Sequence, residues 1–261
     1  GVVAAVVPWN SQLFLVAVKI GPALAAGNTV VLKASEHASA AMLEFGKLIE
    51  EAGLPAGVIN IVTGHADPCG KVLTSHPLVQ RISFTGGTGA ARHVVRNSAE
   101  NFAQVSLELG GKSPFIVFGD ANIESAVNGS IAGIFGASGQ SCVAGSRLYL
   151  HNSFADEFLE RMLDLTGKIR IGDPLADETQ MGPLATSAQI EHIEHQVALA
   201  QQEGGTLLAG GKRPQTPGKG WFYEPTIIAC PDQKMTIVDT ELFGPVLSVL
   251  RFDDEAEVTA L

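Results

Sequence analysis

Hydrophobic runs without polar alternation recur through the first half of the chain. Four of them, at residues 1–7, 28–33, 58–64 and 81–86, are rich in valine, isoleucine and other apolar residues. Strands of this kind are buried on both faces, which is typical of a parallel sheet covered by helices on either side.

Helical patterns separate these runs. Residues 35–53 and 89–100 are the two clearest, and Gly53 followed by Pro55 predicts where the first of them ends. The order strand, helix, strand therefore predicts a Rossmann-like, doubly wound α/β domain built on a parallel sheet.

The alternation of predicted strands and helices continues after Gly111. Strands are predicted within 112–118 and 146–151, and helices within 122–138 and 154–169. A second α/β domain is expected here.

We place the domain boundary at Gly110–Gly111, so the predicted domains are residues 1–110 and 111–261. Within the second, Thr186 and Gln189 predict a capping box at the start of a further helix, because a threonine and a glutamine at this spacing satisfy each other's backbone N–H groups. Residues 210–220, rich in glycine, proline and lysine, predict a surface loop.

Composition narrows the possible partners. The 261 residues carry a net charge of −10, which repels nucleic acid and anionic membranes, and no basic cluster reverses it locally. The most apolar stretch, 13–32, is interrupted by Lys19 and Pro22 and predicts no transmembrane segment. Three cysteines without framework spacing favour reduced thiols, so we expect a cytoplasmic protein whose partners are small molecules or other subunits.

Two short motifs suggest a phosphate-binding loop and a metal site, but each lacks a residue that such a site requires. "GGKS" at 110–113 lacks the earlier glycine of a phosphate-binding loop, because position 106 is serine. His192 and His195 lie one helical turn apart, but no third ligand accompanies them, so no metal site is predicted.

The glycine-rich segment at 84–92 is harder to interpret. It follows a strand and opens a helix, where backbone N–H groups and the helix dipole can hold a pyrophosphate. It departs from the usual dinucleotide fingerprint at Arg92, and many glycine turns exist for steric reasons alone. By itself it leaves nucleotide binding open.

Cys142 stands in a segment of small residues, "FGASGQSCVAGSR" at 135–147. One interpretation is a buried structural cysteine, since free cysteines are among the most buried residues. The other is a nucleophile, for which small neighbours leave open space on both sides of the sulfur.

Six motifs in order and spacing resemble those of the NAD(P)-dependent aldehyde dehydrogenase superfamily. They are "PWN" (8–10), "KASE" (33–36), "FTGGTG" (84–89), "LELGGKSP" (107–114), "GQSC" (139–142) and "ELFGPV" (241–246). The resemblance covers the whole chain but only the middle portion of the longer family chain. It implies an NAD-binding domain incomplete at its N-terminus, followed by a catalytic domain incomplete at its C-terminus.

The resemblance also assigns catalytic roles. Cys142 would attack the aldehyde, and the side-chain amide of Asn10 with the backbone N–H of Cys142 would stabilise the oxyanion. Glu108 would activate the water that cleaves the resulting thioester. Its apolar neighbours Leu107 and Leu109 predict partial burial, which would raise its pKa.

Cofactor contacts follow from the same motifs. Lys33 and Glu36 match the pair that contacts the adenine ribose, and Lys33 is also a catalytic candidate. A carboxylate at Glu36 repels a 2′-phosphate, so NAD is favoured over NADP. Glu241 matches the residue that holds the nicotinamide ribose, with Phe243 beside it. The remaining cofactor-binding candidates are Trp9, Gly86, Gly87 and Leu109.

The phosphate turn departs from the family pattern. Relatives often carry serine where this chain has Gly87, and Gly89 and Ala90 also replace bulkier residues. Loss of the hydroxyl predicts weaker or differently posed pyrophosphate binding.

The predicted function is oxidation of an aldehyde to a carboxylic acid with NAD. Glu108 favours hydrolysis, because superfamily members that pass the acyl group to coenzyme A characteristically lack a base there. The resemblance implies a homo-oligomer, a dimer or tetramer. Two alternatives stay open: a non-redox homologue on the same scaffold, such as a thiol esterase or a binding protein, and an inactive fragment of the enzyme.

Overall fold

A computed structural model describes residues 1–215 and 218–261. The chain divides into two compact units, residues 1–110 (unit 1) and residues 111–261 (unit 2), and each is described by itself. The surface loop predicted at 210–220 includes residues 216 and 217, which lie outside the described residues.

Unit 1 is built on a five-stranded sheet in which every neighbouring pair is parallel. In spatial order β3-β2-β1-β4-β5, its strands are Ile59–Val62, Thr29–Lys33, Val2–Val6, Val79–Gly86 and Gln104–Leu109. Strand β1 lies at the centre, and the chain progresses outward first to one side and then to the other. This order is that of a Rossmann-type half sheet.

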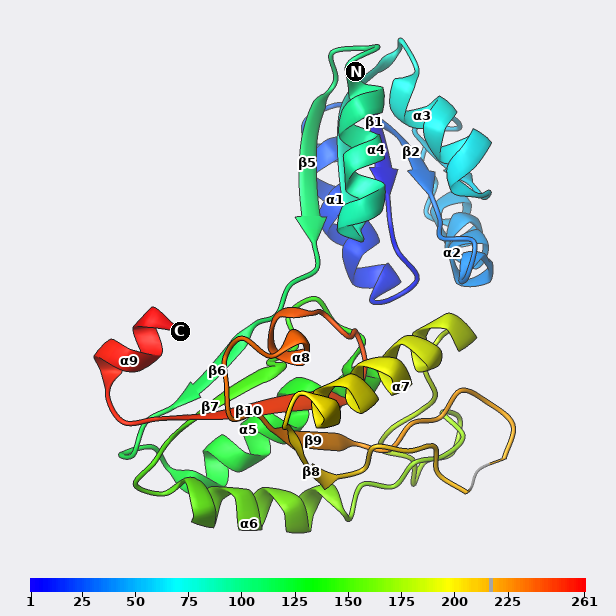
Figure 1. Ribbon diagram of the computed structural model, residues 1–261. Coiled ribbons are helices and arrows are strands. Elements are labelled where there is room, and N and C mark those ends of the chain that lie inside the picture. Colours follow the sequence, from blue (N-terminus) through cyan, green and yellow to red (C-terminus); the bar gives the residue numbers. More distant parts are fainter. Residues whose placement is uncertain (216–217) are drawn as a thin grey trace. The chain divides into compact units, whose positions relative to one another are not determined.

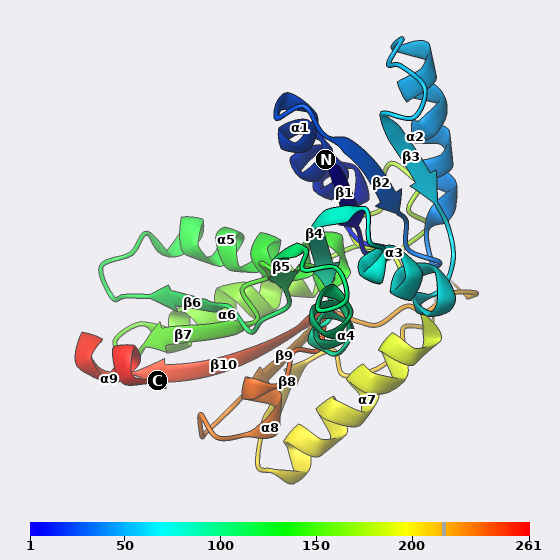
Figure 2. The ribbon, with the colours of Figure 1, turned by 90° about the horizontal axis from the view of Figure 1, so that it is seen from above.

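Helices cover both faces of this sheet (Figure 2). Helices α1 (Gln12–Ala25) and α2 (Ser39–Glu51) pack on one face, and α3 (Lys71–Ser75) and α4 (Thr88–Ser98) pack on the other. A π-type turn, η1 (Ala66–Gly70), precedes α3. The prediction of a doubly wound parallel α/β domain is confirmed.

Helix α1 was not predicted from the sequence. Pro22 lies inside it, at a position where proline removes a hydrogen bond and costs roughly 3 kcal/mol. A stripe of buried residues that includes Val16 and Ile20 packs against β1 and β2. Tertiary burial of this stripe outweighs the local cost.

Unit 2 is a second α/β layer structure. Its sheet has the spatial order β6-β7-β10-β9-β8, with strands Pro114–Val117, Arg147–His151, Val246–Phe252, Thr226–Ala229 and Thr206–Ala209. Among its described strand pairs, β8–β9 alone is antiparallel. The helices are α5 (Ile123–Phe135), α6 (Ala155–Thr166), α7 (Ser187–Gln202), α8 (Thr236–Asp239) and α9 (Glu255–Ala260).

The two faces of this sheet have separate hydrophobic cores. Helices α5 and α6 cover one face, and α7 and α8 cover the other, so that the sheet lies between two helical layers (Figure 1). The predicted second α/β domain is confirmed. No helix in the described ranges is long and apolar enough to cross a membrane.

The start of α7 shows half of the predicted capping box. The Gln189 backbone N–H donates to Thr186 Oγ1 at 3.3 Å. The Gln189 side-chain amide, however, donates to the carbonyl oxygen of Leu242 instead of accepting from the Thr186 backbone. The glutamine therefore ties α7 to the segment that carries Glu241.

Candidate functional site

A cleft of about 780 Å³ opens at the carboxyl ends of β1, β2 and β4 in unit 1. Strands β1 and β4 are the neighbours at which the chain order reverses, which is where open α/β sheets bind their ligands. The volume lies within the usual range for small-molecule sites, roughly 300–1,000 Å³. Five predicted cofactor-binding residues line the cleft: Trp9, Lys33, Glu36, Gly86 and Gly87.

Asn10 and Leu109 do not line this cleft. Both are half-buried residues of unit 1. Their roles stay predictions.

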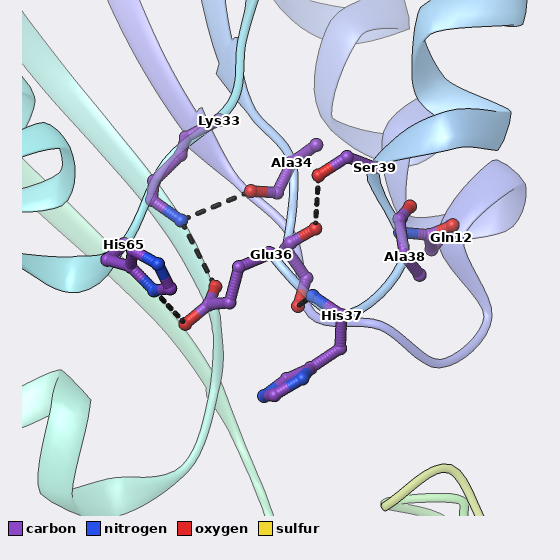
Figure 3. A network of polar contacts seen from close by, with 9 residues as sticks. Gln12, Lys33, Ala34, Glu36, His37, Ala38, Ser39 and His65 are labelled. Atoms are coloured by element: carbon purple, nitrogen blue, oxygen red, sulfur yellow. Dashed lines mark hydrogen bonds and ion pairs between the residues drawn. The ribbon is translucent and has the colours of Figure 1, made fainter.

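Lys33 and Glu36 lie together at the end of β2 (Figure 3). Lys33 Nζ is 3.6 Å from Glu36 Oε2 and also donates to the carbonyl oxygen of Ala34 at 3.1 Å. The other carboxylate oxygen, Glu36 Oε1, is 4.0 Å from Nδ1 of His65. Partial burial acts to raise the pKa of Glu36, but its own backbone N–H and the charge of Lys33 outweigh this and hold the pKa below its usual range.

The glycine turn leads directly into α4. Gly87 is the N-cap of that helix, with φ −72° and ψ 150°, and no described atom beyond its own residue and its two chain neighbours lies within 4 Å of the place where its Cβ would stand. The first turn of α4 therefore presents unpaired N–H groups beside the cleft, a suitable site for a pyrophosphate.

Sequence reasoning missed Thr85, which lines the same cleft. Its hydroxyl is buried and has no hydrogen-bond partner among the described residues. A buried polar group without a partner is costly unless a ligand or water satisfies it. Its position inside the "FTGG" motif was the available signal.

The expected burial of Glu108 is wrong. Glu108 is exposed, and its neighbour Leu107 is 38% exposed, because β5 is an edge strand of the sheet in unit 1. Apolar neighbours along a strand do not bury a residue when no further strand or helix covers that edge.

A second residue that the sequence did not single out is Lys19 on α1. It is buried, and its Nζ donates to Ser83 Oγ on β4 at 3.0 Å. Burial lowers the pKa of Lys19 to about 8, and the charge of Glu108 acts in the opposite direction. A lysine in the apolar stripe of a helix was the signal that could have found it.

The three cysteines have different environments. Cys142 is partly exposed in unit 2, whereas Cys230 is buried and Cys69 belongs to unit 1. Burial raises the pKa of Cys230 to about 11, so this thiol is inert at neutral pH. The interpretation of Cys142 as a sealed, buried cysteine does not fit its exposure.

The backbone before Cys142 is unusual. Ala137, Ser138 and Gly139 all have positive φ, between 50° and 72°. Ser138 is buried and donates its hydroxyl to the carbonyl oxygen of Gly182 at 2.8 Å. A Cβ on Gly139 would lie 2.1 Å from the carbonyl oxygen of Gly244.

These contacts correct part of the sequence interpretation. Gly139 and Ser138 do not serve as clearance around the thiol: Gly139 lies against the segment that follows Glu241, and Ser138 fixes the loop to the carbonyl oxygen of Gly182. Only glycine combines the positive φ of position 139 with so close an approach of two backbones.

Glu241 and Phe243 lie at that segment. Glu241 Oε1 accepts a hydrogen bond from the Gly111 backbone N–H at 3.2 Å. Both residues line a small hollow of about 10 Å³ that also includes Ser141, the neighbour of Cys142. Unit 2 therefore brings the predicted nicotinamide-ribose residue close to the loop that carries the thiol.

Lys112 lines the same hollow, and its Nζ is buried without a hydrogen-bond partner in the part of the chain that the structure describes. Burial lowers its pKa to about 8, while Cys230 and Glu241 act to raise it. Among the described residues, no group of three histidine, cysteine or acidic side chains is placed to hold a metal ion.

Comparison with known proteins identifies the relatives of this arrangement. The model of the aldehyde dehydrogenase family matches residues 1–261. The chain belongs to the aldehyde dehydrogenase family.

Individual relatives agree with this assignment. The chain is 58% identical, over 98% of its length, to (Z)-2-((N-methylformamido)methylene)-5-hydroxybutyrolactone dehydrogenase of Acinetobacter baylyi. It is 45% identical, over its full length, to a chloroplastic betaine aldehyde dehydrogenase of Beta vulgaris. It spans 52% of each of these proteins, so about half the length of the relatives it matches.

Solved structures show the same relationship. The crystal structure of betaine aldehyde dehydrogenase from Staphylococcus aureus in complex with NAD⁺ superposes with a TM-score of 0.96 at 40% identity. The superposition covers 100% of this chain and 52% of the Staphylococcus aureus chain. Both units thus have the family fold.

Proposed function

We propose that this chain forms the cofactor-binding and nucleophile-bearing parts of an enzyme that oxidises an aldehyde to a carboxylic acid with NAD. In this proposal unit 1 is the NAD-binding domain and unit 2 is the catalytic domain. The observation that carries it is the partly exposed Cys142 on a loop held against the Glu241 segment. The relatives named as aldehyde dehydrogenases support it.

The residues of unit 1 fit the cofactor. The cleft is large enough for a nucleotide, Thr85 offers within it a hydroxyl that no described residue hydrogen-bonds, and the turn at Gly87 is open. Glu36 would accept from the adenine ribose hydroxyls, and the N-terminus of α4 would hold the pyrophosphate. Bound NAD supplies the acceptor for the hydride.

The chemistry would begin at Cys142. Its thiolate adds to the aldehyde carbon and forms a thiohemiacetal, whose oxyanion accepts from the Asn10 side-chain amide and the Cys142 backbone N–H. After the hydride has left, the acyl group remains on the sulfur as a thioester. Glu108 removes a proton from water, and the resulting attack releases the carboxylic acid and the thiolate.

Lys19 interacts electrostatically with Glu108, the proposed general base. Its ammonium is anchored on Ser83, and its charge interacts with that of Glu108. An exposed Glu108 remains accessible to water, which suits hydrolysis of a thioester. We also propose that the intact enzyme is a homo-oligomer.

The first test uses the intact enzyme and a panel of aldehydes. The panel includes betaine aldehyde and hydroxyisobutyraldehyde, after the names of relatives. We expect NADH formation with at least one aldehyde, and a loss of at least about 10³-fold in Cys142→Ala. Cys69→Ala is the matched control and should retain activity, because Cys69 is also a free, partly exposed thiol but lies in unit 1. An active Cys142→Ala variant would refute the nucleophile.

The second test concerns Glu108. In Glu108→Gln, we expect a stoichiometric burst of NADH followed by a steady rate lower by about 10²–10⁴-fold, the usual effect of losing a general base. Mass spectrometry should then detect an acyl group on Cys142. A steady rate equal to that of the wild type would assign the water activation to another group.

A further inference from the structure

The side chain of Lys112 ends in the interior of unit 2. Its Nζ is buried and has no hydrogen-bond partner among the described residues. Burying an ammonium without a partner is costly, so a group of this kind in a folded protein requires a ligand, a water or a function that explains it. The proposed reaction does not use this lysine.

The backbone on both sides of Lys112 is fixed. The Lys112 carbonyl oxygen accepts a hydrogen bond from Arg147 Nε at 2.7 Å. The backbone N–H of the preceding residue, Gly111, donates to Glu241 Oε1 at 3.2 Å, although 130 positions separate these two residues in the sequence. Glu241 is therefore bound to the backbone directly beside Lys112.

The charges around Lys112 single out Glu241 as its counterion. Three groups act on the ammonium electrostatically: Cys230, Arg147 and Glu241. Arg147 repels it, and burial raises the pKa of the Cys230 thiol to about 11, so that thiol is neutral at neutral pH. Because Nζ has no hydrogen-bond partner among the described residues, the attraction to Glu241 acts across a gap and not through a direct contact.

A hollow of about 10 Å³ accounts for this gap. Lys112 and Glu241 both line it, together with Ser141 and Ser146. One water molecule needs a space of roughly 10–15 Å³ and about two to four polar partners. The hollow therefore suits a single water molecule and is too small for a larger ligand.

We propose that Lys112 is a positioning residue: through one water molecule in this hollow, its ammonium holds the Glu241 carboxylate in the orientation that binds the nicotinamide ribose. The inference rests on the proposed function, in which Glu241 has that role. The water accepts from Lys112 Nζ and donates to the carboxylate, while Oε1 also accepts from the Gly111 N–H. A fixed ribose in turn fixes the distance and angle of hydride transfer.

A high-resolution crystal structure of the intact enzyme tests the water directly. We expect one water within hydrogen-bond distance, roughly 2.5–3.2 Å, of both Lys112 Nζ and a Glu241 carboxylate oxygen. This measurement needs neither a cofactor nor turnover, so its result does not depend on the proposed function. A hollow without water would overturn the inference.

The variant Lys112→Met tests the effect on the reaction, because methionine keeps an unbranched apolar chain and removes the charge. Stopped-flow measurement of a single turnover should show hydride transfer slowed about three- to tenfold, the effect of one hydrogen bond. The Kd of NAD⁺, measured by calorimetry, should change less than about twofold, because the proposed contacts with the adenine ribose and pyrophosphate lie in unit 1. The apolar replacement is expected to raise the melting temperature, so unfolding would not explain a slower reaction.

Lys168→Met is the matched control. Lys168 belongs to the same unit and is paired with Asp164 at 2.5 Å, but its side chain is 65% exposed and it does not line the hollow. Its loss should change neither hydride transfer nor the Kd of NAD⁺. Equal slowing in the two variants would overturn the inference, because it would show a general effect of lost positive charge.

A double-mutant cycle with Glu241→Ala separates positioning from support of the fold. If Lys112 acts through Glu241, the double variant should transfer hydride as fast as Glu241→Ala alone. Losses that multiply, or a Lys112→Met rate equal to that of the wild type, would overturn the inference while leaving aldehyde oxidation intact. If the wild type forms no NADH with any aldehyde, the proposed function itself is wrong, and this inference with it.

Discussion

Two glycine-rich segments look alike in the sequence and differ in space. At 84–90 in unit 1, a Cβ on Gly87 or Gly89 would meet no described atom within 4 Å other than those of its chain neighbours and of its own helix backbone. At 135–147 in unit 2, a Cβ on Gly139 would lie 2.1 Å from the Gly244 carbonyl oxygen. At Gly87 and Gly89 the first segment leaves space beside a cleft, although a Cβ on Gly86 would lie 2.8 Å from the Phe84 ring, whereas at Gly139 another part of the backbone fills the space.

The difference shows that glycine has two separate uses in this chain. Before α4, glycine leaves room where a side chain would also fit. Before Cys142, glycine permits a positive φ and a contact between two backbones, which holds the thiol loop in place. Richness in glycine by itself does not distinguish these uses.

The strongest test of this comparison is Gly139→Ala. We expect it to lower the free energy of unfolding by more than about 3 kcal/mol, because a positive φ and an overlap with backbone atoms are both unfavourable. Differential scanning calorimetry of the intact enzyme would show the lowered transition, and activity should fall with it.

Gly136→Ala is the control for that variant. Gly136 has φ −55°, and nothing described lies within 4 Å of its Cβ position. Its substitution should change the melting temperature little. Equal effects at the two positions would show that the backbone contact at Gly139 is unimportant.

The close packing of unit 2 also buries the side-chain nitrogen of Lys112. Lys112 Nζ has no hydrogen-bond partner among the described residues, whereas Lys33 in the open cleft of unit 1 is paired. Replacing a buried ion pair with apolar side chains of similar volume is neutral or stabilises a protein by about 1–4 kcal/mol, and a buried charge without a partner lacks even the attraction that offsets its desolvation. We therefore expect Lys112→Met to be more stable than the wild type at neutral pH.

The stability advantage of Lys112→Met over the wild type should decrease at alkaline pH. The pKa of Lys112 is about 8 in the folded chain, below its ordinary value of 10.5, so the unfolded chain binds more protons between these values. Wild-type stability therefore rises over this window relative to that of the variant. The difference in melting temperature, measured at neutral pH and near the upper end of the window, checks this. A constant difference would mean that Lys112 is not a buried cation.

The smallest effect is expected at Gly87. Gly87→Ser should stabilise α4 by about 0.5 kcal/mol, because serine is a good N-cap and restricts the unfolded chain. Its hydroxyl should also tighten NAD⁺ binding severalfold, as measured by calorimetry. A loss of stability would show that the turn is less open than the contacts indicate.

Regular patterns along the chain predicted the α/β class of both units and part of their layers. Uninterrupted apolar runs predicted the parallel strands β1 to β4, β6 and β7, but not β5, β8, β9 or β10. Gly53, with φ +76°, follows the end of α2 as expected. Threonine at 186 predicted the N-cap of α7. These features depend on residues a few positions apart, so the sequence alone determined them.

Other features depended on residues distant in the sequence. The apolar stripe of α1 overcame Pro22 because β1 and β2 were there to pack against, and Glu108 is exposed because no described strand pairs with the outer edge of β5. Gly139 is required because Gly244, about a hundred positions later, lies against it. Burial, charge environment and steric contact are properties of neighbours in space, so only the tertiary structure decided them.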